Sequence, residues 1–232
     1  MYYVLVVPPA FHHLYQRQIE EMFRQRYRVF VEILGWELPD VDHKRRLEID
    51  QFDRADTVYL IVMKQGNVVS ASRMIPTTTP NMMSEVFPDL CQNGVPRDAG
   101  TWEWSRAHVN PDAPYQERSL LIDYIFLSGY EFAYYAGISA LSAQINAAEI
   151  DRWLDRGLVV DLLGPPTHHK DGSELLALQH HITAKILSNV RRETDINDSV
   201  LRLPTMTRSL SSLRELIDVQ APYTQASHST TR

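Results

Sequence analysis

A predicted β-hairpin constrains the fold of this chain more than any other feature. Residues 58–63 and 68–74 are apolar and rich in β-branched side chains, and the turn residues Gln65-Gly66-Asn67 separate them. This pattern is typical of two antiparallel strands joined by a short turn. The chain therefore contains a sheet, against which its other elements must pack.

Hydrophobic periodicity predicts the elements around this hairpin. The apolar start, residues 1–9, is typical of a strand, and residues 11–30 have the apolar spacing of a helix that ends at Gly35. Residues 37–57 are polar and irregular, and a loop of that length is usually functional. After the hairpin we expect a short helix at 82–87, strands at 102–109, 138–144 and 158–163, and helices at 117–136, 146–156 and 173–192.

This order of elements predicts an α+β fold, a mixed α/β sandwich in which helices pack on one central sheet. Neither G-x-G-x-x-G nor G-x-x-x-x-G-K-[ST] occurs in the sequence, so we do not expect a doubly wound dinucleotide-binding fold. With 232 residues, the chain is expected to form one domain over residues 1–219. Residues 220–232, with Ser, Thr and few large apolar side chains, are expected to form a disordered tail.

Composition excludes several classes of protein. No apolar run approaches the roughly 18 residues that a bilayer span needs, and the start lacks the basic region of a signal peptide. The single cysteine, Cys91, rules out an internal disulfide framework, and we expect it to be a structural thiol in a reducing cytoplasm. A net charge of −6 argues against broad nucleic-acid binding.

The segment at residues 101–106, Thr-Trp-Glu-Trp-Ser-Arg, concentrates chemistry in one predicted strand. Glu103 is a candidate general base if partial burial adjusts its pKa. In a regular strand Glu103 and Ser105 share one face while Arg106 points to the other. If Glu103 and Arg106 serve one site, the strand must bulge, so we predict a β-bulge near Ser105.

Two other segments contain candidate binding residues. Arg26 and Phe30 lie four residues apart on one helix face, and Trp36 follows the helix end, a combination suited to a cationic or aromatic ligand. The alternative is that Phe30 and Trp36 pack in the core while Arg26 is exposed. The acidic groups of the segment Glu48-Ile49-Asp50-Gln51-Phe52-Asp53 suit an ammonium, a sulfonium or a nearby arginine.

Arg73, at the end of the hairpin, is the arginine that Asp50 or Asp53 would hold in an ion-paired pocket. The alternatives are a solvated acidic turn and an exposed arginine. Three histidine pairs, at 12–13, 168–169 and 180–181, lack metal-ligand spacing, so we expect no metal site.

Taken together, these motifs resemble the acyl-homoserine lactone synthases, the autoinducer synthase family of bacterial quorum sensing. Residues 75–78, Ile-Pro-Thr-Thr, and the stretch from Pro80 to Phe87 also look like that family, and the resemblance covers about residues 20–110. The main positions of the family pattern are filled in order by Arg26, Phe30, Leu34-Gly35-Trp36, Asp50, Asp53, Arg73, Glu103 and Arg106.

The resemblance implies an N-acetyltransferase-like fold, a central twisted sheet with a V-shaped cleft between two splayed strands. It implies that the amine of S-adenosylmethionine attacks an acyl thioester, after which lactone closure releases methylthioadenosine. S-adenosylmethionine is then a substrate, and no cofactor is expected. Glu103 would be the catalytic base with Arg106 beside it, and the S-adenosylmethionine pocket would be formed by Arg26, Phe30, Trp36, Asp50, Asp53 and Arg73.

The resemblance also implies an apolar tunnel for the acyl chain and an acyl donor, either acyl carrier protein or acyl-CoA. Basic helix residues would suit the acidic carrier protein, although solvated helix charges are the ordinary alternative. The candidate tunnel walls are Ile125, Phe126, Leu141, Ala143 and Leu162, and the candidate docking residues are Arg152, Arg156, Lys185, Arg191 and Arg192.

Two other functions remain open on sequence. An acetyl-CoA-dependent N-acyltransferase usually has a Q/R-x-x-G-x-G/A loop, but Val109 is followed by Asn-Pro-Asp-Ala-Pro-Tyr, without glycine. A non-catalytic regulator that binds S-adenosylmethionine or an acyl carrier would tolerate loss of its base, whereas this chain has Glu103 and the other matched positions.

Overall fold

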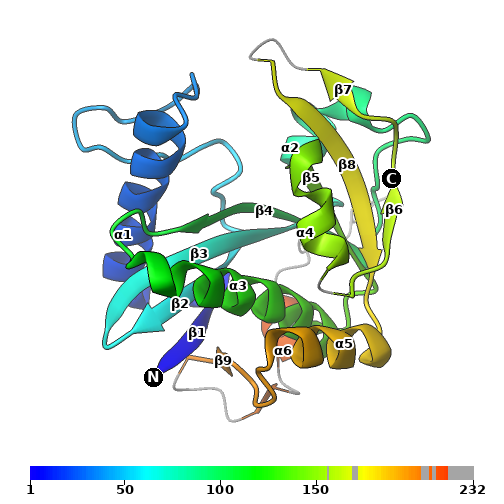
Figure 1. The fold of residues 1–232 in the computed structure, drawn as a ribbon. Coiled ribbons are helices and arrows are strands. Elements are labelled where there is room, and N and C mark those ends of the chain that lie inside the picture. The colour runs from blue at the N-terminus through cyan, green and yellow to red at the C-terminus, as the bar shows by residue number, and fades with distance from the viewer. Residues whose placement is uncertain (156, 169–171, 205–208, 211–212, 219–232) are drawn as a thin grey trace, which may run out of the picture.

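A computed structural model describes residues 1–155, 157–168, 172–204, 209–210 and 213–218. A mixed sheet with the strand order β6-β8-β5-β4-β3-β2-β1-β9 forms the centre of the molecule, and β7 pairs with β8 (Figure 1). The strands are β1 (Tyr2–Val7), β2 (Val58–Lys64), β3 (Asn67–Pro76), β4 (Thr101–Val109), β5 (Ala140–Asn146), β6 (Val160–Leu162), β7 (Thr167–His168), β8 (Glu174–His181) and β9 (Leu201–Arg202).

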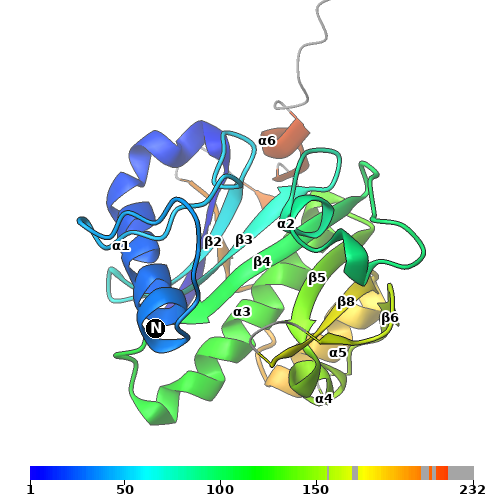
Figure 2. The same cartoon turned by 90° about the horizontal axis from the view of Figure 1, so that it is seen from above.

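Helices cover both faces of this sheet (Figure 2). The α-helices are α1 (Gln16–Arg26), α2 (Met82–Glu85), α3 (Tyr115–Ala136), α4 (Ile150–Leu154), α5 (Ala184–Thr194) and α6 (Leu213–Asp218). Other helical segments are the 3-10 turns η1 (Pro9–Leu14), η3 (Pro88–Leu90) and η4 (Ala147–Glu149), and the π-helix η2 (Tyr27–Ile33). None of the helices in the described part of the chain has the length and apolarity of a membrane span.

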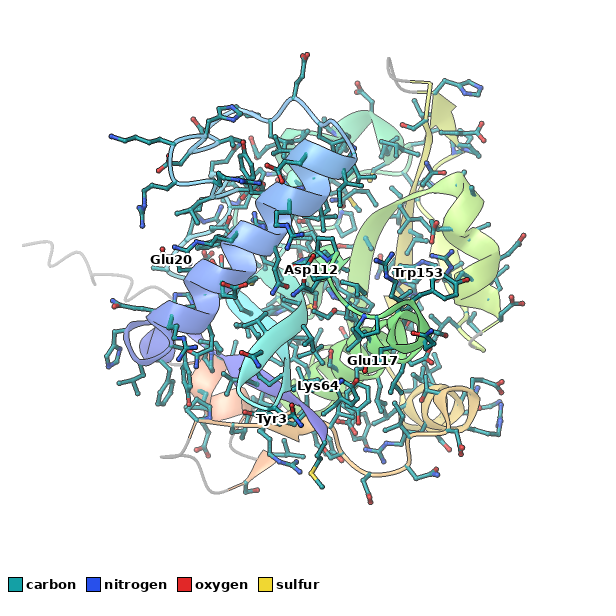
Figure 3. The ribbon with its side chains drawn as sticks, turned by 60° about the vertical axis from the view of Figure 1, so that its left-hand side comes forward. Tyr3, Glu20, Lys64, Asp112, Glu117 and Trp153 are labelled. Atoms are coloured by element: carbon teal, nitrogen blue, oxygen red, sulfur yellow. The ribbon has the colours of Figure 1, made fainter. Side chains whose placement is uncertain are left out.

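The predicted hairpin is confirmed as β2 and β3, which pair antiparallel. Alternate residues of β2 enter two different cores: Leu60 packs in the α3-side cluster, and Ile61 in the α1-side cluster. Because both faces are covered, β2 is apolar at nearly every position instead of alternating. Lys64, at its end, donates to Glu117 at 2.6 Å and so ties the hairpin to the start of α3 (Figure 3).

The sheet divides where β4 and β5 separate. The two strands pair in parallel from Thr101 and Ala140 to Glu103 and Ser142. Beyond this point β4 continues along β3 to Val109, whereas β5 continues along β8 to Asn146. The backbones therefore diverge next to Glu103, as the expected V-shaped opening requires (Figures 1 and 2).

The predicted β-bulge near Ser105 is confirmed. Arg73 lies opposite Ser105 and Ala71 opposite His108, so Ser72 on β3 faces two residues of β4, Arg106 and Ala107. Arg106 has φ +55°, in the left-handed region. The extra residue changes the alternation of β4 and re-aims the side chains that follow it.

The predicted helix at 173–192 is wrong in its first half. Residues 174–181 form β8, which pairs with both β5 and β6, and the helix α5 begins at Ala184 behind the N-cap Thr183. Leucine and alanine favour helices, but pairing with two neighbouring strands overrides that weak preference. Arg156 and residues 220–232, for which a helix end and a tail were predicted, lie outside the described residues.

Candidate active site

Buried charges from four segments meet beneath α1. Arg26, at the end of α1, donates through Nε to Glu48 and through both terminal nitrogens to Asp53, at 2.8 and 2.9 Å. Its side chain is 1 % exposed, which excludes the alternative of a surface arginine. Arg26 thus holds the loop after the helix against the sheet.

The other two arginines of this cluster come from the sheet. Arg73 on β3 contacts Asp50 at 2.5 Å and Asp53 at 3.1 Å. Arg106, at the bulge of β4, contacts Glu48 at 3.0 Å and Asp50 at 2.9 Å. Three guanidinium groups therefore face three carboxylates, and every member of the cluster has an oppositely charged partner.

This pairing determines the ionisation of the carboxylates. Burial alone would raise the pKa of Glu48 and of Asp53. The charge of Arg26 opposes burial at both groups, helped by Arg106 at Glu48 and by Arg73 at Asp53, so both pKa values lie below their usual range. Glu48 and Asp53 are therefore ionised at neutral pH, each opposite an arginine.

A π-helix positions the aromatic candidates. The chain continues from α1 into η2, where backbone bonds widen to the i→i+5 pattern, as in Leu34 N–H to the Val29 carbonyl at 2.9 Å. Phe30 in η2 stacks on Trp36, with ring centroids 4.9 Å apart and planes 11° apart. The Arg106 guanidinium lies 5.3 Å from the Phe30 centroid, so the aromatic pair adjoins the charged cluster.

Glu103 occupies a different environment from the clustered carboxylates. It is fully buried on β4 and accepts hydrogen bonds from the backbone N–H groups of Met83 at 2.7 Å and Met82 at 3.3 Å. No salt bridge to Glu103 occurs among the residues described. Burial raises its pKa, while the Met83 N–H and the Arg73 charge oppose that rise only in part.

Glu103 and Arg106 lie on one face but do not touch each other. Arg106 Nη1 lies 3.3 Å from Met82 Sδ, and the Met82 N–H is directed at Glu103. A carboxylate with a raised pKa thus lies next to the ion-pair network, with only Met82 between them. Such an arrangement makes Glu103 a better proton acceptor than an ordinary glutamate, beside a site that holds charged groups.

Comparison with known proteins gives the family of this chain. The autoinducer synthase family model matches residues 10–183. The chain belongs to the autoinducer synthase family. The isovaleryl-homoserine lactone synthase of Bradyrhizobium diazoefficiens is 39 % identical over 155 residues, which cover 66 % of this chain and 68 % of the relative.

Solved structures agree with this assignment. The CoA-dependent acyl-homoserine lactone synthase BjaI, solved with SAM and isopentyl-CoA, is 29 % identical with a TM-score of 0.81, over 93 % of this chain and 99 % of that one. An acyl-CoA N-acyltransferase from Pseudomonas aeruginosa, 14 % identical with a TM-score of 0.51 over 78 % of this chain and 99 % of that one, shares the fold alone. The expected N-acetyltransferase-like fold is thus confirmed.

Two polar residues of this candidate site, Glu48 and His108, were not assigned to the predicted pocket. Glu48 belongs to the acidic segment that the sequence indicated, but its 1 % exposure and its two arginine partners appear only in the fold. His108 is 5 % exposed and lies on the same face as Arg106. Regular alternation assigns His108 to the face of Trp104, and the bulge reverses that assignment.

The candidate acyl-tunnel residues separate into two groups. Ile125 and Phe126 of α3 and Leu141 of β5 are buried in one cluster, and Ala143 is buried further along β5. Leu162 is 50 % exposed on the edge strand β6, so it does not lie with the other four. Beside the first group, Trp104 is edge-on to Phe126 and Trp153, with centroids 5.8 and 5.7 Å apart.

The candidate carrier-protein residues are mostly neutralised by neighbours. Arg152 pairs with Glu149 at 2.5 Å, Arg192 with Glu193 at 2.9 Å, and Arg191 with the buried Glu131. Lys185 lies on the same helix as Arg191 and Arg192. Of these, only Arg191 is paired with a buried acid, whereas Arg152 and Arg192 are exposed with an acidic neighbour.

The remaining sequence predictions concern Cys91 and metals. Cys91 is buried, and burial raises the pKa of its thiol, as suits a structural cysteine. Among the residues that the structure describes, no three His, Cys, Asp or Glu side chains form a group able to hold a metal ion.

Proposed function

We propose that this chain is an acyl-homoserine lactone synthase in which Glu103 is the catalytic base. The S-adenosylmethionine amine attacks the thioester carbonyl, and the thiol leaves as the amide forms. The methionine-derived carboxylate then displaces methylthioadenosine, which closes the lactone. The observation that carries this proposal is Glu103, buried and outside the ion-pair network, at the point where β4 and β5 diverge.

Glu103 has the properties of the required proton acceptor. The substrate amine is an ammonium at neutral pH and must lose a proton before it can attack. The raised pKa of Glu103 makes it a better acceptor than an ordinary glutamate. The Met82 and Met83 N–H groups hold its carboxylate in place. In the proposed reaction it takes the proton of the amine directly or through one water.

The charged cluster and the aromatic pair suit the S-adenosylmethionine pocket. Arg26, Asp50, Asp53, Arg73 and Arg106 fix the N-terminal region over the sheet, which orders the pocket before substrate enters. Trp36 is exposed and offers its outer ring face to the sulfonium or adenine, while buried Phe30 supports it from the other side, next to the Arg106 guanidinium. Lactone closure then depends mainly on positioning, because the sulfonium is already a good leaving group.

The divergence of the strands supports the acyl-transfer step. Past Glu103, β4 has its ladder partner β3 on one side, and β5 turns away on the other. Backbone N–H groups along that open side are suited to stabilise the tetrahedral oxyanion. The acyl chain passes toward the buried cluster that contains Ile125, Phe126 and Leu141.

Acyl-CoA is the donor that we propose. The similar structure BjaI is described as CoA-dependent, and Arg152, Arg191 and Arg192 of this chain are already paired with acids. The acidic neighbours of these arginines lower the positive potential that an acidic carrier protein would meet on these helices.

The test supplies S-adenosylmethionine with the same acyl group on CoA or on acyl carrier protein. We expect acyl-homoserine lactone from acyl-CoA, with a kcat/KM at least about tenfold higher than for the carrier-protein thioester, equivalent to about 1.4 kcal/mol of selectivity. Higher kcat/KM with the carrier protein would reject CoA as the donor but keep the lactone synthase. No lactone from either donor would reject the synthase itself.

A further inference from the structure

His108 makes a hydrogen bond to the bulge of β4. Its Nδ1 lies 3.0 Å from the carbonyl oxygen of Arg106, two residues earlier in the same strand. The ring is buried, and its edge faces Phe30 with centroids 6.0 Å apart. His108 therefore touches both the backbone of the bulge and the aromatic wall of the site.

The bulge needs such support. Arg106 adopts φ +55°, a region that side chains with a Cβ rarely occupy. This conformation directs its guanidinium to Glu48 and Asp50 on the face of Glu103. If the bulge relaxed into a regular strand, Arg106 would turn to the opposite face and the cluster would lose one of its cations.

The hydrogen bond fixes the state of the imidazole. A carbonyl oxygen can only accept, so Nδ1 carries the proton and Nε2 has the lone pair. Burial lowers the pKa of His108 to about 4, and the nearby charges of Arg26 and Arg106 act in the same direction. The ring is therefore neutral at pH 7, and within the described chain Nε2 has no hydrogen-bond partner.

A second contact holds the same strand segment. The carbonyl of His108 accepts a hydrogen bond from the Ser70 hydroxyl on β3, at 2.6 Å. His108 is thus anchored to β3 by its backbone and to Arg106 by its side chain. It is also the first residue of β4 after the bulge that pairs with β3, opposite Ala71.

We propose that His108 is a positioning residue for Arg106. The Nδ1–H group of His108 holds the Arg106 carbonyl in the bulge, and this backbone position directs the Arg106 guanidinium to Glu48 and Asp50. The kinetic part of its test rests on the proposed function, since it measures S-adenosylmethionine use. The hydrogen bond itself can be tested without any turnover.

Three variants separate the hydrogen bond from packing. Asn places a side-chain N–H near the position of Nδ1, Gln places its amide near Nε2, and Leu fills volume without a donor. We expect His108→Asn to keep the KM for S-adenosylmethionine within about threefold, while His108→Gln and His108→Leu raise it about tenfold, the effect of one lost hydrogen bond. The KM for acyl-CoA should stay constant in all three.

Equal KM values for S-adenosylmethionine in the Asn and Leu variants would overturn the proposal, because packing alone would then explain the residue. A direct measurement covers the case in which variants fail to fold. Nitrogen-15 NMR of the wild-type imidazole at pH 7 should report the neutral ring protonated at Nδ1. A ring protonated at Nε2, or a charged ring, would overturn the proposal even if the chain made no lactone.

Discussion

Two buried glutamates within one site have opposite pKa shifts, and their neighbours explain the difference. Glu48 lies between the guanidinium groups of Arg26 and Arg106, which hold its pKa low against burial. Glu103 has backbone N–H partners, so burial dominates and raises its pKa. The same residue type thus provides a fixed charge at one position and a proton acceptor at the other.

Replacement of Glu103 by Gln should separate chemistry from folding. The amide keeps the shape of the side chain but cannot take a proton, so we expect kcat to fall by about 10²–10⁴-fold, the usual contribution of a general base. Binding of methylthioadenosine, measured by calorimetry, should change little. Glu85→Gln, an exposed change on α2, is the matched control and should leave kcat unchanged. Wild-type turnover in Glu103→Gln would remove Glu103 from the role of base.

The pH dependence follows from the same residues. Glu103 acts as a base only when ionised, and its pKa is raised, so the rate should be lost as pH falls through a value above the ordinary glutamate pKa of about 4.3. Glu48 and Asp53 have lowered pKa values in the folded state, so the stability that they contribute persists until lower pH. Rate and circular dichroism recorded over one titration should show activity lost before structure. Simultaneous loss of both would contradict this assignment.

At the residue scale, sequence predicted most of the cluster but not its geometry. Arg26, Asp50, Asp53, Arg73 and Arg106 were all indicated, and the structure brings them together. Their mutual pairing depends on how the loop at 37–57 folds back under α1, which no local pattern specifies. His108 was missed, although the bulge predicted near Ser105 reverses the alternation of the residues that follow it and so assigns His108 to the face of Arg106.

At the scale of elements, β4 combines two functions on its two faces. Glu103 and Ser105 face the charged cluster, whereas Trp102 and Trp104 enter the core beneath α3. The indole of Trp104 lies directly on the backbone of α3 at Gly129, where an added Cβ would be 2.9 Å from Trp104 Cζ2. A glycine in the middle of a 22-residue helix is therefore required by the tryptophan opposite it.

Gly129→Ala tests this interlock between α3 and β4. Alanine in a helix interior normally stabilises by about 1 kcal/mol over glycine. Here we expect the opposite sign, a loss of about 1–3 kcal/mol in the free energy of unfolding, because the new methyl group overpacks the core. In a Trp104→Leu background the same change should regain its stabilising sign. Urea unfolding of the four proteins measures the coupling, and additive effects would show that the two residues do not interact.

The elements also mark where sequence patterns fail. The hairpin was predictable because its turn residues and its apolar runs both indicate two paired strands. The bulge was predictable because Glu103 and Arg106 had to reach the same face of β4. The strand β8 was not, since its leucines and alanine fit a helix equally well in isolation. These residues form a strand because they pair with β5 on one side and β6 on the other, and no local pattern in the sequence shows that pairing.

At the scale of the whole molecule, the charged cluster joins the N-terminal helix to the sheet. Its three cations and three anions are buried together, so the loss of one leaves an uncompensated charge. Buried Glu131 of α3 likewise holds a later segment of the chain. It accepts hydrogen bonds from the Val200 N–H and the Ser199 hydroxyl, each at 3.0 Å. The segments that contain Arg26 and Val200 are thus both held by buried carboxylates.

Asp53→Asn should therefore destabilise the whole domain. Removal of one partner from a buried ion-pair network costs about 3–5 kcal/mol of unfolding free energy. Glu20→Gln, which removes an exposed partner of Arg24 on α1, is the control and should cost less than about 1 kcal/mol (Figure 3). Chemical denaturation gives both values. Equal, small losses would indicate that the network contributes little to the fold.

The central claim, lactone synthesis from S-adenosylmethionine, is tested most directly by product stoichiometry. The purified chain is given acyl-CoA and S-adenosylmethionine labelled with nitrogen-15 at the amine, and the products are quantified by mass spectrometry. We predict acyl-homoserine lactone that carries the label, together with equal amounts of methylthioadenosine and free CoA. Labelled acyl-amide without methylthioadenosine, or methylthioadenosine without lactone, would contradict the account.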